Sequence, residues 1–304
     1  MNKNQNKKSS IAGSIITILV LIVMAILGAN GDGLYSSQAQ NVDQVDNLEK
    51  VTIHTGEGVI SKIPNDGNLR VYCLDVGQGD CILVVNNNKT MLIDASTNQM
   101  GTKIVDYLRK LGITKIDYLI GTHPHEDHIG GIDNVISSFV IDKFYMPKRQ
   151  ANTKTFEDVL DAASKKKLKI STPSVGDKFN VGDAECEVMS VSNDAENVNN
   201  CSIVIQMTYD GVKYLFTGDM ESDMEAARSW NQVDILKVGH HGSKTSSSKK
   251  FLDQTKPKIA LISCGEGNDY GHPHDVAVKR IEKIGAKIYR TDKDKTIMVL
   301  QEKK

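Results

Sequence analysis

The stretch His123-Pro124-His125-Glu126-Asp127-His128 contains three imidazoles and two carboxylates within six residues. The apolar run at 116–120 before it is typical of a buried strand, and Ile129-Gly130-Gly131 after it begins a predicted helix. A loop between a strand and a helix can direct these side chains toward one point. Because imidazoles and carboxylates are ligands of divalent metals, the stretch predicts a metal site.

The composition of the whole chain is that of an ordinary globular protein. It has 304 residues, 25% charged residues and a formal net charge of −1, so no overall field attracts nucleic acid or an acidic membrane. The five cysteines form no CxxC pair, which argues against a structural zinc knuckle. The sequence is compatible with either one disulfide or buried reduced thiols.

Residues 1–31 are predicted to form an N-terminal membrane anchor. Lys3, Lys7 and Lys8 precede a stretch at 9–31 that has no charged residue. A membrane span needs about 20 apolar residues, whereas the apolar part of a signal peptide has about 7 to 15. The segment lies between these lengths, and we favour an anchor over a cleaved signal peptide. The positive-inside rule then keeps the lysines in the cytoplasm and places the rest of the chain outside.

Residues 32–66 are predicted to be a linker, because polar residues and glycine are frequent and apolar periodicity is weak. Residues 67–304 form the predicted globular domain. Apolar spacing predicts helices around 104–111, 156–163 and 277–284. Strands are predicted at 70–74, 81–85, 90–93, 116–120, 185–191, 202–208, 212–216, 234–238, 259–262, 287–289 and 296–300. This order fits two sheets packed face to face and covered by helices.

Three further predicted strands end in potential ligands. Asp94 follows one strand, Asp219 follows Thr217-Gly218 after another, and His240-His241 follow a third. An aspartate after a strand is commonly a turn or helix cap when it is taken alone. Adjacent histidines point in different directions, so we expect one of the two to be a ligand. Together with residues 123–128, these strand ends form a set that turns and caps do not explain.

The sequence resembles the metallo-β-lactamase fold superfamily and, within it, the extracellular hydrolase domain of ComEC-type competence proteins. The resemblance covers nearly all of residues 69–300. It implies an α/β fold, an αββα four-layer sandwich, preceded by the N-terminal transmembrane or signal segment. The similar stretches are LDVGQGDCILV at 74–84, LIDAS at 92–96, GTHPHEDHIGGI at 121–132, FTGDM at 216–220, ILKVGHHGS at 235–243 and YGHP at 270–273.

The resemblance implies a centre with two divalent metal ions, Mn²⁺ or Zn²⁺, with Mg²⁺ as a further option. Asp94 would orient a ligand imidazole and fix its tautomer, and His241 would form part of the wall of the site. By position, His123 and His125 would hold the first ion, Asp127, His128 and His240 the second, and Asp219 would bridge both.

One stretch departs from the wider superfamily. Most members supply another histidine to the first metal ahead of the Thr-Gly-Asp motif, but residues 196–202 contain none. The carbonyl oxygen of Asn200, or a water molecule, would fill that position. An oxygen-rich first site favours manganese or magnesium over tightly bound zinc.

A two-metal centre suits the hydrolysis of a phosphodiester. Asp127 and Asp219 are then expected to hold the attacking water, and His272 to protonate the leaving group. His274 is a second candidate for that role or for phosphate binding, although a helix-capping loop would also explain both histidines. Ser243 and Lys244 are candidates for phosphate contacts.

The predicted function is an extracytoplasmic, metal-dependent nuclease or phosphodiesterase that acts on DNA. The N-terminal segment would hold it at the cell membrane with a single pass, or the domain would be secreted if that segment is cleaved. One alternative is a phosphoesterase acting on cell-wall phosphorylcholine or another small phosphoester. Another is a non-catalytic binding module on a hydrolase scaffold, which the presence of Asp127, His128, Asp219 and His240 argues against. ComEC-type proteins carry a multi-span channel, whereas this sequence has one candidate span at most, so DNA uptake by this chain alone is not expected. The sequence does not identify protein partners.

Overall fold

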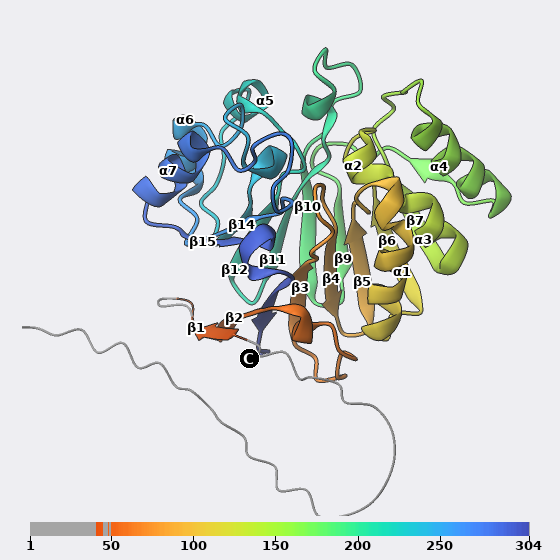
Figure 1. Ribbon diagram of the computed structural model, residues 1–304, viewed down its shortest axis with the longest axis horizontal. Helices are drawn as coiled ribbons and strands as arrows, with labels where there is room; N and C mark the ends of the chain where they lie inside the picture. The colour runs from red at the N-terminus through yellow and green to blue at the C-terminus, as the bar shows by residue number, and fades with distance from the viewer. Residues whose placement is uncertain (1–40, 45–47, 49, 304) are drawn as a thin grey trace, which may run out of the picture. The chain divides into compact units, whose positions relative to one another are not determined.

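Two β-sheets pack face to face between two groups of helices (Figure 1). The computed structural model describes residues 41–44, 48 and 50–303. For these residues the expected α/β fold with two central sheets and outer helices is confirmed. The anchor predicted at 1–31 lies outside the described residues. Within the described part of the chain, no helix is long and apolar enough to cross a membrane.

The first sheet has nine strands in the order β1-β2-β16-β3-β4-β5-β6-β7-β8. It is antiparallel from β1 to β5 and parallel from β5 to β8. The bounds are β1 Asn41–Gln44, β2 Val51–Thr55, β3 Leu69–Cys73, β4 Ile82–Asn86, β5 Lys89–Ile93, β6 Lys115–Ile120, β7 Val140–Tyr145, β8 Ile170–Ser171 and β16 Ile297–Gln301.

The second sheet has seven strands in the order β15-β14-β13-β12-β11-β10-β9. Strands β12 to β15 are parallel, and β9 to β12 are antiparallel. The bounds are β9 Lys178–Val181, β10 Ala184–Ser190, β11 Val204–Tyr209, β12 Val212–Phe216, β13 Ile235–Lys237, β14 Ile259–Ile262 and β15 Lys287–Arg290.

Helices cover the outer face of each sheet (Figure 1). The first sheet packs against α1 Gly101–Lys110, α2 Glu126–Ile129, α3 Ile132–Ser138 and α4 Lys154–Lys165. The second packs against α5 Ser222–Ala226, α6 Lys249–Thr255 and α7 Asp275–Lys283, and the short α8 Thr291–Asp294 precedes β16. The 3₁₀ turns are η1 Glu57–Val59, η2 Asn98–Met100, η3 Val198–Cys201 and η4 Gly239–Gly242.

Strand β4 shows why the central strands are apolar without interruption. Ile82 and Val84 pack into the core between the two sheets, whereas Leu83 and Val85 pack against the outer helices. Successive side chains of a strand point to opposite faces, so a sheet that is covered on both faces needs apolar residues at every position. The same rule explains why the sequence predicted these strands.

The parallel strands bring the candidate ligands to one edge of the fold. In the first sheet β5 and β6 run parallel, and in the second sheet β12, β13 and β14 do. The loops that follow these strands carry Asp94, residues 123–128, Asp219 and His240-His241. Ligand sites in such sheets lie outside the carboxyl ends of the parallel strands.

The linker predicted at 32–66 differs from the structure, because it contains part of the first sheet. In β2, Val51, Ile53 and Thr55 are buried and alternate with half-buried residues. Ile53 pairs with Val299 of β16. Five residues of alternation within a polar stretch are too few to stand out as a strand, and pairing with a distant strand supplies the burial.

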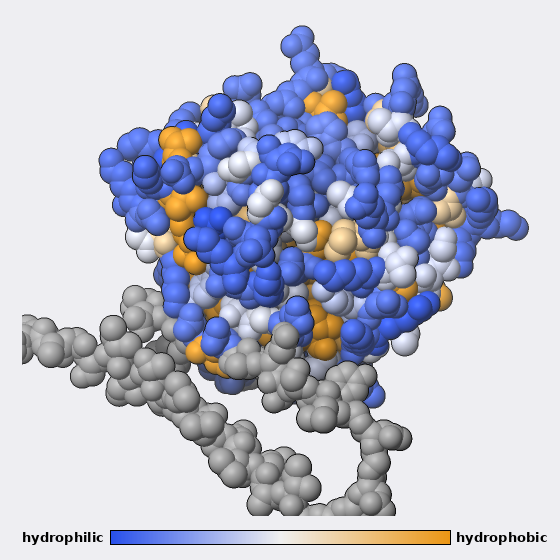
Figure 2. Space-filling model, viewed as in Figure 1, coloured by the Kyte–Doolittle hydropathy of each residue, from blue (hydrophilic) through white to orange (hydrophobic). Residues whose placement is uncertain are grey.

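The exposed hydrophobic side chains of the described residues are scattered over the surface. The exposed large hydrophobic side chains come from separate elements, and on the face drawn in Figure 2 the hydrophobic residues lie in small separate areas. All five cysteines, which are Cys73, Cys81, Cys186, Cys201 and Cys264, are buried and free. Buried reduced thiols are therefore the alternative that the structure supports.

We expect Ile53→Ala to lower the free energy of unfolding by about 2–5 kcal/mol, since this fully buried side chain lies between the sheets. Val42→Ala in β1 is the control, because Val42 is 56% exposed and its loss should cost less than about 0.5 kcal/mol. Chemical denaturation of both variants measures the difference. Equal, small effects would mean that β2 is not part of the folded core.

Candidate metal centre

The loop between β6 and α2 and the first residues of α2 carry the histidine-rich stretch into the interior. His123 and His128 are fully buried, Asp127 is half-buried and His125 is exposed. Ile129 packs into the core between the first sheet and its helices, which anchors the loop. The core therefore fixes the positions of His123 and His128, whereas His125 lies at the surface.

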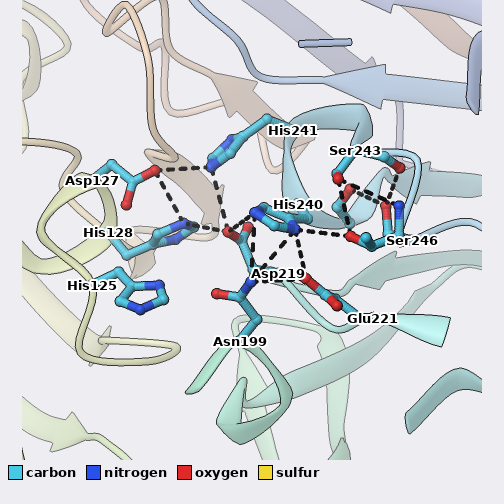
Figure 3. Close-up of polar contacts among 12 residues, drawn as sticks. His125, Asp127, His128, Asn199, Asp219, Glu221, His240, His241, Ser243 and Ser246 are labelled. Atoms are coloured by element: carbon cyan, nitrogen blue, oxygen red, sulfur yellow. Dashed lines mark hydrogen bonds and ion pairs between the residues drawn. The ribbon is translucent and has the colours of Figure 1, made fainter. Parts of the chain in front are cut away.

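The buried carboxylate of Asp219 is the centre of the cluster. Its Oδ2 lies 3.2 Å from Nε2 of His128 and 3.5 Å from Nε2 of His241. Nε2 of His241 is also 3.2 Å from Oδ2 of Asp127. Figure 3 shows Asp127 and His128 approaching Asp219 from one side, and His240 and Glu221 from the other. Ligand atoms of Asp127, His128, Asp219 and His241 all lie within 4.8 Å of one another.

Opposite charges set the protonation of this cluster. Burial alone would raise the pKa of Asp219, but the imidazoles of His128 and His241 hold it well below its usual value. Burial would lower the pKa of His241, but the carboxylates of Asp219 and Asp80 raise it to about 10. The pKa of His128 is likewise raised well above its usual value by Asp219 and Asp94, against the effect of burial. Without metal, protonated imidazoles therefore supply the positive charge.

Asp94 lies behind His128, as the sequence analysis expected of a carboxylate that orients a ligand. Its Oδ2 is 2.7 Å from Nδ1 of His128, and it also accepts from the Oγ1 of Thr122 at 2.7 Å. The carboxylate is fully buried. A carboxylate can only accept here, so Nδ1 of His128 carries the proton and Nε2 faces Asp219.

His123 and His125 form a neighbouring pair. Nε2 of His123 lies 3.0 Å from Nδ1 of His125 and 3.9 Å from Oδ2 of Asp219. Burial lowers the pKa of both imidazoles, and that of His123 falls well below its usual value. Both rings are therefore neutral near pH 7, which is the form that binds a metal.

The structure places His241, and not His240, in the cluster. The sequence analysis gave the ligand role to His240 and the wall of the site to His241. Nε2 of His240 lies 3.7 Å from Oδ2 of Asp219, and its Nδ1 is 3.0 Å from the carboxylate of Glu221. Both histidines have left-handed backbones, with φ of 49° and 52°. Two such residues in succession turn the chain sharply, and this turn directs the second ring to Asp127.

Asn199, and not Asn200, faces the site. Oδ1 of Asn200, the expected ligand atom, accepts from the backbone N–H of Glu221 at 2.9 Å. Asn199 lines the pocket, and its Nδ2 donates to Glu221 at 3.0 Å. Because both residues lie in the 3₁₀ turn η3, their side-chain amides point in different directions. The side-chain oxygen of Asn199 is buried without a hydrogen-bond partner among the described residues.

A pocket of about 450 Å³ opens beside the cluster, and His272 lines it together with Asp127, Asp219 and the exposed Tyr270. Burial, followed by the nearby imidazoles of His241 and His240, lowers the pKa of His272 to about 4. The remaining candidates do not line this pocket. Nδ1 of His274 accepts from the backbone N–H of Lys244, the hydroxyl of Ser243 bonds Thr245, and the Lys244 side chain is exposed.

The buried atoms of the cluster fit a bound divalent metal. Oδ1 of Asp219 is buried without a hydrogen-bond partner among the described residues, and Nε2 of His128 is buried with ion-pair contacts to Asp219 and Asp127 but no well-oriented hydrogen bond. Buried polar atoms are normally paired, so such atoms need an explanation. A cation held by carboxylates and imidazoles would satisfy both atoms, and this donor set suits zinc or manganese.

Several residues at the site were not found by sequence reasoning. Glu221 follows the Thr-Gly-Asp motif by two residues, and Tyr270 begins the quoted YGHP motif. Asp80 ends the quoted LDVGQGD motif, and Lys237 is a lysine within an apolar strand. A charge inside a buried strand was the one signal that could have identified Lys237, because such charges occur mainly where they are paired.

Two curated proteins are similar in sequence to most of this chain. The chain is 31% identical over 250 residues to ComE operon protein 3 of Bacillus subtilis, which covers 75% of this chain and 32% of that protein. It is 30% identical over 232 residues to Recombination protein 2 of Haemophilus influenzae, covering 73% of this chain and 27% of that protein. The chain thus spans about a third of the length of the curated relatives that it matches.

Solved structures show the same fold at low identity. The diiron β-hydroxylase CmlA of Streptomyces venezuelae aligns with a TM-score of 0.52 and 14% identity, over 79% of this chain and 55% of that one. The family model for the metallo-beta-lactamase superfamily matches residues 74–266, which include every candidate ligand. The chain belongs to the metallo-beta-lactamase superfamily.

Proposed function

We propose that this chain is a metal-dependent phosphodiesterase that cleaves nucleic acid outside the cytoplasmic membrane. The observation that carries the proposal is the buried cluster of Asp127, His128, Asp219 and His241, whose ligand atoms lie within 4.8 Å of one another. The name of one relative, Recombination protein 2, favours nucleic acid over other phosphoesters. The basis for the location is the uncharged stretch at 9–31 behind three lysines.

Two ions would be held by different parts of the cluster. His123 and His125 would bind the first, with the unpartnered oxygen of Asn199 in place of a third histidine. Asp127, His128 and His241 would bind the second ion, and Asp219 would contribute to both. When bound, divalent ions supply Lewis-acid chemistry, because they polarise a phosphoryl oxygen and lower the pKa of a water molecule to about 7.

His240 is the residue best placed to move a proton. Its Nδ1 lies 3.0 Å from Oε1 of Glu221, which also accepts from Asn199 at 3.0 Å. Glu221 holds the ring at the pocket wall, with Nε2 3.7 Å from Oδ2 of Asp219. We assign to His240 the proton donation to the leaving group that the sequence analysis gave to His272. With a pKa of about 4, His272 is neutral near pH 7 and is suited to accept a hydrogen bond there.

Tyr270 bears on the class of substrate. It lines the pocket and is 65% exposed, and its ring lies nearly parallel to that of His272, at 16°. Asn268 fixes this loop, because its side chain binds both the backbone N–H and the carbonyl of His272. A rigid, exposed aromatic ring beside a phosphodiester site can stack on a nucleobase.

The same ring argues against phosphorylcholine as the substrate. Quaternary ammonium groups are recognised by cages of several aromatic rings. Tyr270 alone among the residues that line this pocket in the described chain is a Phe, Tyr or Trp. A nucleobase needs only one such surface.

The proposal is tested by stripping metal from the purified protein and resupplying Mn²⁺, Zn²⁺ or Mg²⁺. We expect cleavage of single-stranded DNA and of bis-p-nitrophenyl phosphate, and little turnover of p-nitrophenyl phosphorylcholine. Asp219→Asn should abolish all turnover. Metal binding without turnover of any phosphoester would favour a binding module instead. Protease added to intact cells should digest the domain if it lies outside the membrane.

We expect His241→Ala and His240→Ala to separate metal binding from catalysis. His241→Ala should lower metal affinity, measured by competition with a fluorescent chelator. His240→Ala should keep that affinity and lower kcat by about 10²- to 10⁴-fold, since it removes a proton donor. His274→Ala is the control, because this ring lies outside the pocket. Loss of metal in His240→Ala alone would restore the assignment made from the sequence.

Metal affinity is expected to rise with pH. The pKa of His241 is about 10 and that of His128 is also raised, so both imidazoles carry protons that the metal must displace. Each displaced proton makes binding about tenfold tighter per pH unit until the imidazole is neutral. Chelator competition between pH 6 and pH 8.5 gives the slope. A flat profile would show that the metal-free imidazoles are already neutral.

Tyr270→Ala is expected to raise KM for the p-nitrophenyl ester of thymidine 5′-phosphate by about 5- to 150-fold, the size of one lost stacking contact. Methyl p-nitrophenyl phosphate has no base, so Tyr270→Ala should hydrolyse it as efficiently as the unmodified protein does. Tyr270→Phe retains the ring and should behave normally on both substrates. An equal loss on both substrates would exclude base stacking.

A further inference from the structure

A lysine and an aspartate form a buried ion pair directly behind the metal cluster. Lys237 is the last residue of β13 and is 1% exposed, and Asp80 in the loop before β4 is 2% exposed. The Nζ of Lys237 lies 2.5 Å from Oδ2 of Asp80 and donates to the carbonyl of Val238 at 2.9 Å. Such pairs contribute little net stability, so their presence calls for another reason.

The second oxygen of Asp80 faces a candidate ligand. Oδ1 lies 3.3 Å from Nδ1 of His241, and the same Nδ1 is 3.0 Å from the backbone carbonyl of Ser263. Both oxygens can only accept, so Nδ1 of His241 carries the proton. Nε2 is the nitrogen that faces Asp127 and Asp219, so it would offer its lone pair to a metal once its proton is displaced.

The same loop also fixes the backbone of Asp127. The N–H of Asp80 donates to the carbonyl of Asp127 at 3.0 Å. A Cβ at Gly79 would lie 2.3 Å from that carbonyl oxygen, so only glycine permits this approach. The hydroxyl of Ser263 donates to the carbonyl of Gly79 at 2.7 Å. One short loop therefore holds two ligands of the cluster, one through its ring and one through its backbone.

We propose that Asp80 and Lys237 are positioning residues for the metal centre. Asp80 orients the imidazole of His241, and Lys237 holds Asp80 in place and compensates its charge. Asp80 stands behind His241 as Asp94 stands behind His128, with the carboxylate oxygen 3.3 Å from Nδ1 in place of 2.7 Å. The inference rests on the metal-dependent function proposed above. It predicts that the pair sets metal affinity more than it sets the stability of the fold.

The test uses two double variants, because either single change would leave a buried charge without its partner. Asp80→Leu with Lys237→Met removes both charges and the side-chain acceptor for His241, and leaves the carbonyl of Ser263 as its one acceptor there. Asp80→Asn with Lys237→Met also removes both charges but keeps an acceptor oxygen. Asp66→Asn is the control, since it breaks the ion pair with Arg70 in a different pocket.

We expect both double variants to fold, with thermal midpoints of the metal-free proteins close to that of the unmodified protein. The leucine variant should bind Zn²⁺ about 10- to 100-fold more weakly, as is typical when the partner of a ligand is lost. The asparagine variant should recover most of the affinity, and Asp66→Asn should leave it unchanged. Normal Zn²⁺ affinity in a folded leucine variant would overturn the inference.

A second measurement needs no variant. In the Zn²⁺-loaded protein, long-range ¹H–¹⁵N correlation spectra should show the proton of His241 on Nδ1 and the metal on Nε2. The opposite tautomer would overturn the inference even if the leucine variant does not fold. These readouts use Zn²⁺ alone, so a protein that binds the ion but cleaves no phosphodiester would leave the inference standing and reject the proposed function. Failure of the unmodified protein to bind any metal would reject both.

Discussion

Oδ2 of Asp219 lies within 3.5 Å of two imidazole nitrogens, those of His128 and His241, at a depth where the carboxylate is only 2% exposed. A carboxylate buried alone would take up a proton, because the interior solvates its charge poorly. Each imidazole in turn has its own carboxylate behind it, Asp94 or Asp80. The charge of every member therefore depends on its neighbours, and the cluster titrates as one unit.

This cluster is assembled from two sheets, and glycine makes the approach possible. Gly218, just before Asp219, has φ of 52°, and a Cβ there would lie 2.8 Å from the hydroxyl of Ser202 and 3.0 Å from Thr122. That hydroxyl also accepts from the N–H of Asp219 at 3.0 Å. Thr122 belongs to the first sheet's loop and Gly218 to the second sheet's loop. The Thr-Gly-Asp motif is thus a contact between the two halves of the fold as well as a source of a ligand.

Much of the fold could be predicted because the central strands are covered on both faces. Their apolar runs, such as residues 82–85 of β4, are visible in the sequence. Strand β2 could not be predicted, because its five residues gain their burial from β16, nearly 250 residues away. The strand-end positions of Asp94 and Asp219 were predictable for the same reason as the strands.

Sequence reasoning was less able to predict side-chain directions. It named His240 and Asn200 as ligands, whereas the structure turns the neighbouring His241 and Asn199 toward the cluster and the pocket. That choice depends on local backbone angles, which a single sequence does not reveal. Lys237 was missed because the apolar run around it was interpreted only as a strand, and its partner lies in a distant loop.

The backbone at His240-His241 links strain to function. Left-handed conformations cost about 1–3 kcal/mol each in residues other than glycine, and two occur here in succession. In a regular strand, adjacent side chains point to opposite faces, so one of the two rings would leave the site. The observed turn keeps both rings at the pocket, with His241 beside Asp127 and Asp219 and His240 beside Glu221. The anchoring of His241 by Asp80 and Ser263 then holds a conformation that the two histidines would not adopt unaided.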